Sequence, residues 1–148
     1  MRSLTIPLLA LSLALASLIP ASAAAAQDVP VAPPAPAIPP IPWQLTAFPG
    51  VTAGIEPGRY TVQFVPDGTV TIRADCNWVL GTWSAANGAL DITVTQTTVA
   101  ACPEDSLEVA FVQGLDEATA YLIDASMALV ISGPGGDLRF AAALPAMA

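Results

Sequence analysis

The sequence contains neither histidine nor lysine, and its four basic residues are all arginines: Arg2, Arg59, Arg73 and Arg139. Without lysine the chain cannot form a Schiff base. Without imidazole it lacks the side chain that most often acts as a general base or binds zinc near neutral pH. Negative charge dominates, with a formal net charge of -8 and an isoelectric point near 4.1. Nucleic acids and anionic lipid surfaces bind clustered cations, so neither is an expected partner.

Charge is absent between Arg2 and Asp28, where an apolar run extends from residue 4 to residue 19. Pro20 breaks this run, and Ala21-Ser22-Ala23 follows as a cleavage site for signal peptidase. The sequence therefore predicts a signal peptide over residues 1–23. A membrane anchor is disfavoured because the run is shorter than the roughly 20 apolar residues that a span needs. No cysteine near the site can carry a lipid, so we expect a periplasmic or secreted mature chain that is not inserted in the membrane.

Proline is abundant in the next segment, with seven prolines between Val29 and Pro42. Each proline lacks an amide donor and fixes φ near the polyproline II value. We expect residues 24–42 to form an extended, semi-rigid linker that does not join a sheet. A ligand for a partner domain that binds PxxP motifs is the alternative, but no basic residue flanks the segment.

The rest of the 148-residue chain is long enough for one small domain, which we place at residues 43–142, with a tail at 143–148. Apolar and polar residues alternate there with the period of strands. Asp67-Gly68 and Asn87-Gly88 are turn dipeptides typical of hairpins. The predicted strands are two hairpins, 60–64 with 70–73 and 81–83 with 90–94, followed by a meander of 120–123, 127–131 and 138–142.

One segment, residues 103–115, has helical spacing instead, with Leu107, Phe111 and Leu115 on one face. Pro103 suits a first helical turn, and acidic residues at 104 and 105 would complement the helix dipole. The sequence thus predicts an α+β domain, a mainly antiparallel β-sheet rolled toward a small barrel with one packed helix.

The two cysteines, Cys76 and Cys102, are 26 positions apart. In an oxidising compartment we expect them to form a disulfide, which stabilises by about 3.5 kcal/mol in the chain-entropy model. A thiol nucleophile, a metal pair and two unpaired buried thiols are the alternatives. The first two are disfavoured because no histidine or lysine is present to activate a thiolate or complete a zinc site.

Several motifs resemble, in order and spacing, those of the META domain family, the HslJ-like heat-shock proteins. They are Asp75-Cys76-Asn77, Gly81-Thr82-Trp83, Asn87-Gly88-Ala89-Leu90-Asp91-Ile92, Thr97-Thr98-Val99-Ala100-Ala101-Cys102-Pro103 and Gly135-Gly136-Asp137-Leu138-Arg139-Phe140. Of these, Asp75, Asn77, Gly81, Thr98 and Pro103 are the family-motif residues. The chain departs from the family at Asp75, where glycine is common, at Trp78, where a polar or basic residue is common, and at Ala100, where methionine is common.

The resemblance implies a β-rich domain with one helix, exported to the bacterial envelope and associated with heat or envelope stress. The family has no established catalytic residues, so none is carried over. Carboxylates at Asp67 and Asp91 are explained by turns, and the serines lack a histidine partner. Glu104, Asp105 and Glu108 lack the glycine-punctuated loop that calcium sites often have. We therefore expect no catalytic residue, no metal and no cofactor.

Two tryptophans are candidates for partner binding. Trp78 and Trp83 are five residues apart, so a regular strand places them on opposite faces. An exposed tryptophan can anchor a partner, although packing in the core is the common role. Our leading hypothesis is a non-enzymatic, monomeric module that binds or supports an unknown envelope protein. An inhibitor of a secreted protease or lysozyme, and a carboxylate-dependent hydrolase, are the alternatives.

Overall fold

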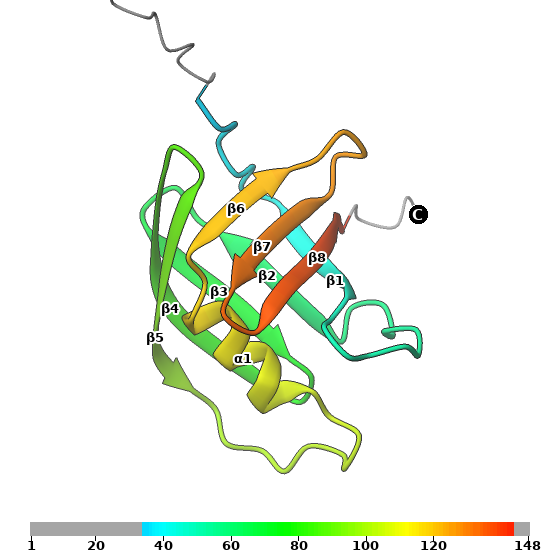
Figure 1. Ribbon diagram of the computed structural model, residues 1–148. Helices are drawn as coiled ribbons and strands as arrows, with labels where there is room; N and C mark the ends of the chain where they lie inside the picture. Colours follow the sequence, from blue (N-terminus) through cyan, green and yellow to red (C-terminus); the bar gives the residue numbers. More distant parts are fainter. Residues whose placement is uncertain (1–33, 144–148) are drawn as a thin grey trace, which may run out of the picture. The chain divides into compact units, whose positions relative to one another are not determined.

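A computed structural model describes residues 34–143, in which eight antiparallel strands form a closed ring with one helix (Figure 1). Each strand pairs with the next along the chain, and β8 returns to β1. The elements are β1 (Pro42–Ala47), β2 (Tyr60–Phe64), β3 (Thr69–Ala74), β4 (Asn77–Ala86), β5 (Ala89–Thr97), α1 (Glu108–Asp116), β6 (Ala120–Ile123), β7 (Leu129–Gly133) and β8 (Gly136–Ala142). The predicted fold class is confirmed.

The ring is not a regular barrel, because β5 and β6 pair through a single residue pair, Ala89 with Ala120. The other neighbouring strands share at least three paired positions, as β1 and β2 do. Farther along β5, the carboxylate of Asp116 on α1 accepts a hydrogen bond from the backbone amide of Val94 at 2.8 Å. The helix thus partly replaces the missing strand partner at this junction.

Turn chemistry explains the hairpins. At the β4–β5 turn both Asn87 and Gly88 have positive φ, as a two-residue hairpin turn requires. At the β2–β3 turn the Asp67 carboxylate accepts a hydrogen bond from the amide of Thr69 at 2.8 Å. Both predicted hairpins are confirmed, and the second is longer than predicted. Strand β1 was missed, because Pro42, its first residue, continues the proline-rich segment.

The helix begins later than predicted. Pro103 does not lie in its first turn; its carbonyl accepts a hydrogen bond from the amide of Ser106 in a separate turn. The carboxylate of Asp105 is bonded to Arg59, 46 positions earlier. Glu104 and Asp105 therefore precede the helix, and Glu108 is the acidic residue in its first turn.

The interior of the ring is filled by side chains. Alternate positions of each strand point inward, and the largest fully buried side chains include Trp43, Phe64, Phe111 and Phe140. The helix closes one end, where the ring of Phe111 meets that of Tyr60 edge-on with centroids 5.3 Å apart. The ring centroid of Phe111 also lies 6.2 Å from that of Phe140 on β8. These aromatic contacts pack the helix against β2 and β8.

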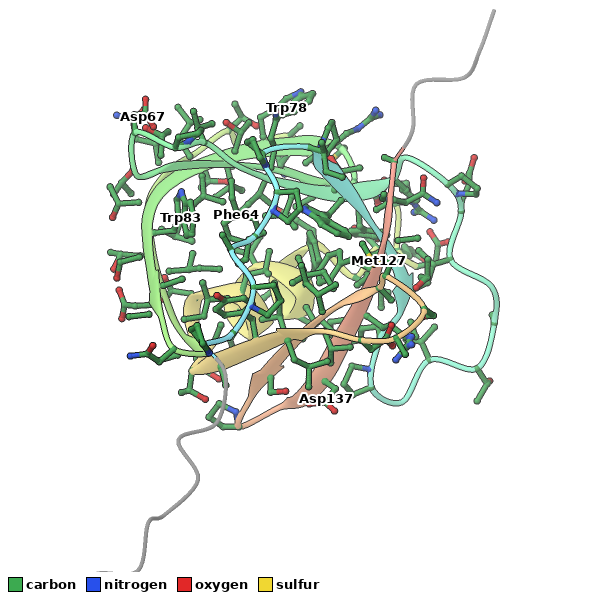
Figure 2. All side chains as sticks on the ribbon, turned by 90° about the horizontal axis from the view of Figure 1, so that it is seen from above. Phe64, Asp67, Trp78, Trp83, Met127 and Asp137 are labelled. Atoms are coloured by element: carbon green, nitrogen blue, oxygen red, sulfur yellow. A yellow bond between two sulfur atoms is a disulfide. The ribbon has the colours of Figure 1, made fainter. Side chains whose placement is uncertain are left out.

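The opposite end of the ring is crossed by residues 34–41, the last part of the predicted linker (Figure 2). This part forms no strand and packs against the domain, and the chain bends at residues 40 and 41. Pro42, the last residue of the predicted linker, lies in β1 and pairs with Gln63. The predicted signal peptide, residues 24–33 and residues 144–148 lie outside the described residues. Within the described range, no helix has the length and apolar character needed to cross a membrane.

The backbones of β4 and β5 approach each other closely at Gly81. Their register shifts between Leu80 and Gly81, and a Cβ at Gly81 would collide with the carbonyl oxygen of Thr93. We predict that Gly81→Ala lowers the free energy of unfolding by about 1–3 kcal/mol in urea titrations, because backbone must move to admit the methyl group. Gly54→Ala is the matched control, since a Cβ at Gly54 meets open space. Equal effects of the two substitutions would contradict the close packing.

Candidate functional site

The disulfide joins Cys76, in the β3–β4 turn, to Cys102, before the helix, with the two Cα atoms 5.4 Å apart. The predicted pairing is therefore confirmed. A sulfur in a disulfide is neither a thiolate nucleophile nor a metal ligand, so the alternatives for these cysteines do not apply in the oxidised chain. The bond fixes the segment that leads into α1 against the end of the first hairpin.

Asn77, the first residue of β4, is 2% exposed and organises the region around the disulfide. Its side-chain oxygen accepts hydrogen bonds from the Thr98 hydroxyl at 2.9 Å and from the Ala100 amide at 2.7 Å. Its side-chain nitrogen donates to the Ala100 carbonyl at 3.1 Å and to the Glu108 carboxylate at 2.9 Å. Both donors and both acceptor positions of the amide are thus used. Asn77 ties β4, the 98–102 segment and the start of α1 together.

Arg59 lies between two carboxylates next to the disulfide. It donates to both oxygens of Asp75 at 2.8 and 2.9 Å, and to both oxygens of Asp105 at 3.1 Å. The hydrogen bonds from Arg59 hold the pKa of Asp75 and the pKa of Asp105 below the ordinary value. The same bonds raise the pKa of Arg59. The three groups form an ion cluster that stays charged at neutral pH.

A pocket of about 330 Å³ opens beside this cluster, with Arg59, Tyr60, Asp105 and Leu107 in its wall. An anion is a poor ligand for it, because two carboxylates already satisfy the Arg59 guanidinium and Glu56 adds further negative charge. The hydroxyl of Tyr60 is also engaged, since it accepts a hydrogen bond from the Leu107 amide at 2.8 Å. The polar groups of Arg59, Tyr60 and Asp105 are thus engaged within the chain itself.

The carboxyl groups whose pKa values shift do so downward. For Asp124, hydrogen bonds from Ser126 and from the amide of Ala128 lower the pKa to about 2, with a smaller contribution from Arg139. A glycosidase-type general acid needs the opposite shift, because it must keep its proton near neutral pH. Among the described residues, no three His, Cys, Asp or Glu side chains are grouped to hold a metal ion.

Trp78 and Trp83 point to opposite faces of β4 (Figure 2). Trp83 lies inside the ring; its indole donates a hydrogen bond to the Val65 carbonyl at 2.8 Å, and its ring meets Phe64 edge-on at 5.0 Å. Trp83 is partly buried and packs against the core, so it is a weaker candidate for partner binding than Trp78. Trp78 is 54% exposed on the outer face, with the guanidinium of Arg73 5.9 Å from its ring centroid.

The structure brings most of the family-motif residues together. Asp75, Asn77, Thr98 and Pro103 surround the disulfide, whereas Gly81 lies apart at the irregularity between β4 and β5. The sequence analysis missed Arg59 and the contact of Glu108 with Asn77. Both contacts join residues far apart in the chain, and no local pattern marks them. The scarcity of arginine was the available signal for Arg59.

The chain is similar to one protein family and to two solved structures. Residues 37–144 match the family model described as the META domain. No curated protein matches the chain. The NMR structure of a protein from Burkholderia xenovorans is similar, with 19% identity, a TM-score of 0.54, and coverage of 72% of this chain and 83% of that one. The crystal structure of a DUF4847 family protein from Bacteroides vulgatus has 20% identity and a TM-score of 0.48, covering 69% of this chain and 92% of that one.

The disulfide gives one prediction. Cys76→Ser and Cys102→Ser should each lower the free energy of unfolding by about 3.5 kcal/mol, and the double variant should lose no more than either single variant. One bond is lost in every case. Denaturant titrations with and without reductant measure this, and the reduced wild-type chain should match the variants. Additive losses would mean that the two sulfurs contribute separately.

The ion pair of Arg59 and Asp75 gives a prediction for pH. Because the pKa of Asp75 is lower in the folded chain, its stabilisation is present above the ordinary value of 3.8 and is lost as the pH falls through the folded-state pKa. Asp75→Asn should lower the melting temperature at pH 7 by about 5 °C, and the difference from wild type should shrink below pH 4. Asp137→Asn, at an exposed position of β8, is the control. A difference from wild type that is constant from pH 7 to pH 2 would refute this assignment.

Proposed function

The chain belongs to the META domain family, and from this premise we propose that it is an exported, non-catalytic module that binds a protein of the cell envelope. Export is supported by the sequence pattern of residues 1–23 and by the bond between Cys76 and Cys102, since such bonds persist in oxidising compartments. An association with heat or envelope stress is part of the proposal and rests on the family resemblance.

A non-catalytic role is supported by the hydrogen bonds and ion pairs that the polar side chains already make within the chain. Asp75 and Asp105 are bonded to Arg59, and the buried amide of Asn77 has its hydrogen-bonding capacity filled by the chain itself. Catalytic carboxyls need a pKa near the working pH, whereas the pKa of Asp75 and that of Asp105 are lowered. These groups are best explained as the structural support of the outer face nearby.

A binding role is carried by one observation, the exposed side chain of Trp78 on a strand whose backbone is fixed at that residue. Its backbone amide donates to the Thr98 hydroxyl, and its carbonyl accepts from the Thr98 amide, both at 2.9 Å. Leu80, two positions along the same face of β4, is also exposed. Tryptophan, tyrosine and arginine are the residues most enriched at interface hot spots, and an anchor on a backbone that is already ordered loses no backbone entropy on binding. Arg73 beside Trp78 favours a partner with an apolar pocket next to a carboxylate.

The test is capture of an envelope partner with matched variants. We expect crosslinking in periplasmic extract to recover a partner with wild type and with Leu122→Ala, and to lose it at least tenfold with Trp78→Ala. Leu122 is the control because it is an exposed apolar residue on β6, away from Trp78. Recovery that is unchanged by Trp78→Ala, or absent for wild type under normal and stress growth, would contradict the proposal. Stoichiometric loss of lysozyme or protease activity on titration would favour a hydrolase inhibitor instead.

A further inference from the structure

Residues 34–41 have a three-residue repeat in their contacts with the ring. Ile38 is 6% exposed and belongs to the core cluster, and Ala35 and Ile41 pack against that cluster, whereas Pro36, Ala37 and Pro40 are exposed. The inward residues are thus three positions apart. A polyproline II helix has three residues per turn, so it places every third side chain on one face, and the spacing of Ala35 and Ile38 fits this repeat. The chain then bends at residues 40 and 41, where the Ile41 amide donates to the Pro39 carbonyl at 2.9 Å. The prolines at 34, 36, 39 and 40 restrict φ to the value that this helix needs.

The carbonyl groups follow the same repeat. The hydroxyl of Tyr121 on β6 donates to the carbonyl of Pro36 at 3.0 Å, and the indole of Trp43 on β1 donates to the carbonyl of Pro39 at 3.2 Å. Pro36 and Pro39 are again three residues apart. Trp43 and Tyr121 are themselves buried, so their polar atoms need partners in the folded chain. The segment supplies both.

The position of the segment completes the pattern. Ala35 lies by the β4–β5 turn, close to Gly88, and the chain then passes Tyr121 and reaches β1 at Pro42. Figure 2 shows this course across the end of the ring opposite α1. Two aromatic donors and an apolar floor, matched to a peptide of three-residue period, are the features by which proteins recognise proline-rich ligands.

We propose that this end of the ring is a binding site for a proline-rich peptide and that residues 34–41 are its intramolecular occupant. We name it the mouth site and define it by Trp43, Gly88 and Tyr121. It is separate from the outer face around Trp78. The ligand is a peptide that contains Ala-x-x-Ile-x-x-Ile with prolines between. It binds through its carbonyl groups and through the side chains of its alanine and its two isoleucines. A tethered segment has an effective concentration in the mM range, so a free peptide binds well only after the segment is displaced.

The experiment uses a fluorescently labelled peptide with the sequence of residues 34–42, titrated into the purified chain and followed by anisotropy. Ile38→Asp in the protein places a charge in the apolar floor contact and should free the mouth site. We expect the peptide to bind this variant at one site and at least tenfold more tightly than it binds wild type. Ala37→Asp is the matched control, because Ala37 is exposed in the same segment, and it should behave like wild type.

Two further variants make the result specific. Tyr121→Phe, added to Ile38→Asp, removes the hydroxyl donor to the peptide carbonyl and should weaken binding about five- to tenfold. Ile38→Ala should increase peptide binding less than Ile38→Asp does, and it serves as the test if the aspartate variant does not fold. The proposal is overturned if the peptide binds all chains equally, if it fails to bind a folded Ile38 variant, or if the loss of the Tyr121 hydroxyl has no effect.

Discussion

The buried amide of Asn77 is the interaction on which the rest of the domain depends. It is the point where a strand, a segment without regular structure and the first residue of the helix meet, through Thr98, Ala100 and Glu108. Beyond Thr98, residues 99–107 belong to no strand, so their polar backbone groups need side-chain partners such as Asn77 to stay ordered. The disulfide limits how far the segment can move, and Asn77 specifies its position. The orientation of α1, and with it the closure of one end of the ring, follows from that position.

Near Asn77, one of the few arginines of this acidic chain is bonded to two carboxylates. Arg59 neutralises two carboxylates from different segments, so it links the β3–β4 turn to the residues before α1. Asp75 has a φ of 58°, a conformation that glycine adopts freely and aspartate tolerates. The glycine common at this position in the family meets the same backbone requirement. In this chain aspartate meets it too, and adds the ion pair.

The sequence predicted the parts of the fold that local chemistry determines. The hairpins were found because Asp67-Gly68 and Asn87-Gly88 specify turns within a few residues. The start of α1 was misplaced because Arg59 holds Asp105 outside the helix, and this contact spans the first half of the domain. The proline-rich segment was expected to be a spacer. Its packing depends on Tyr121, which no local pattern near residue 38 reveals.

The single pair between β5 and β6 leaves much of one side of β5 without a neighbouring strand. Unpaired strand edges are templates for edge-to-edge association and fibril growth. Here α1 lies against β5, and the carboxylate of Asp116 takes the amide of Val94 that an incoming strand would otherwise use. The helix therefore covers part of the edge that the incomplete closure of the ring would leave open to a second strand.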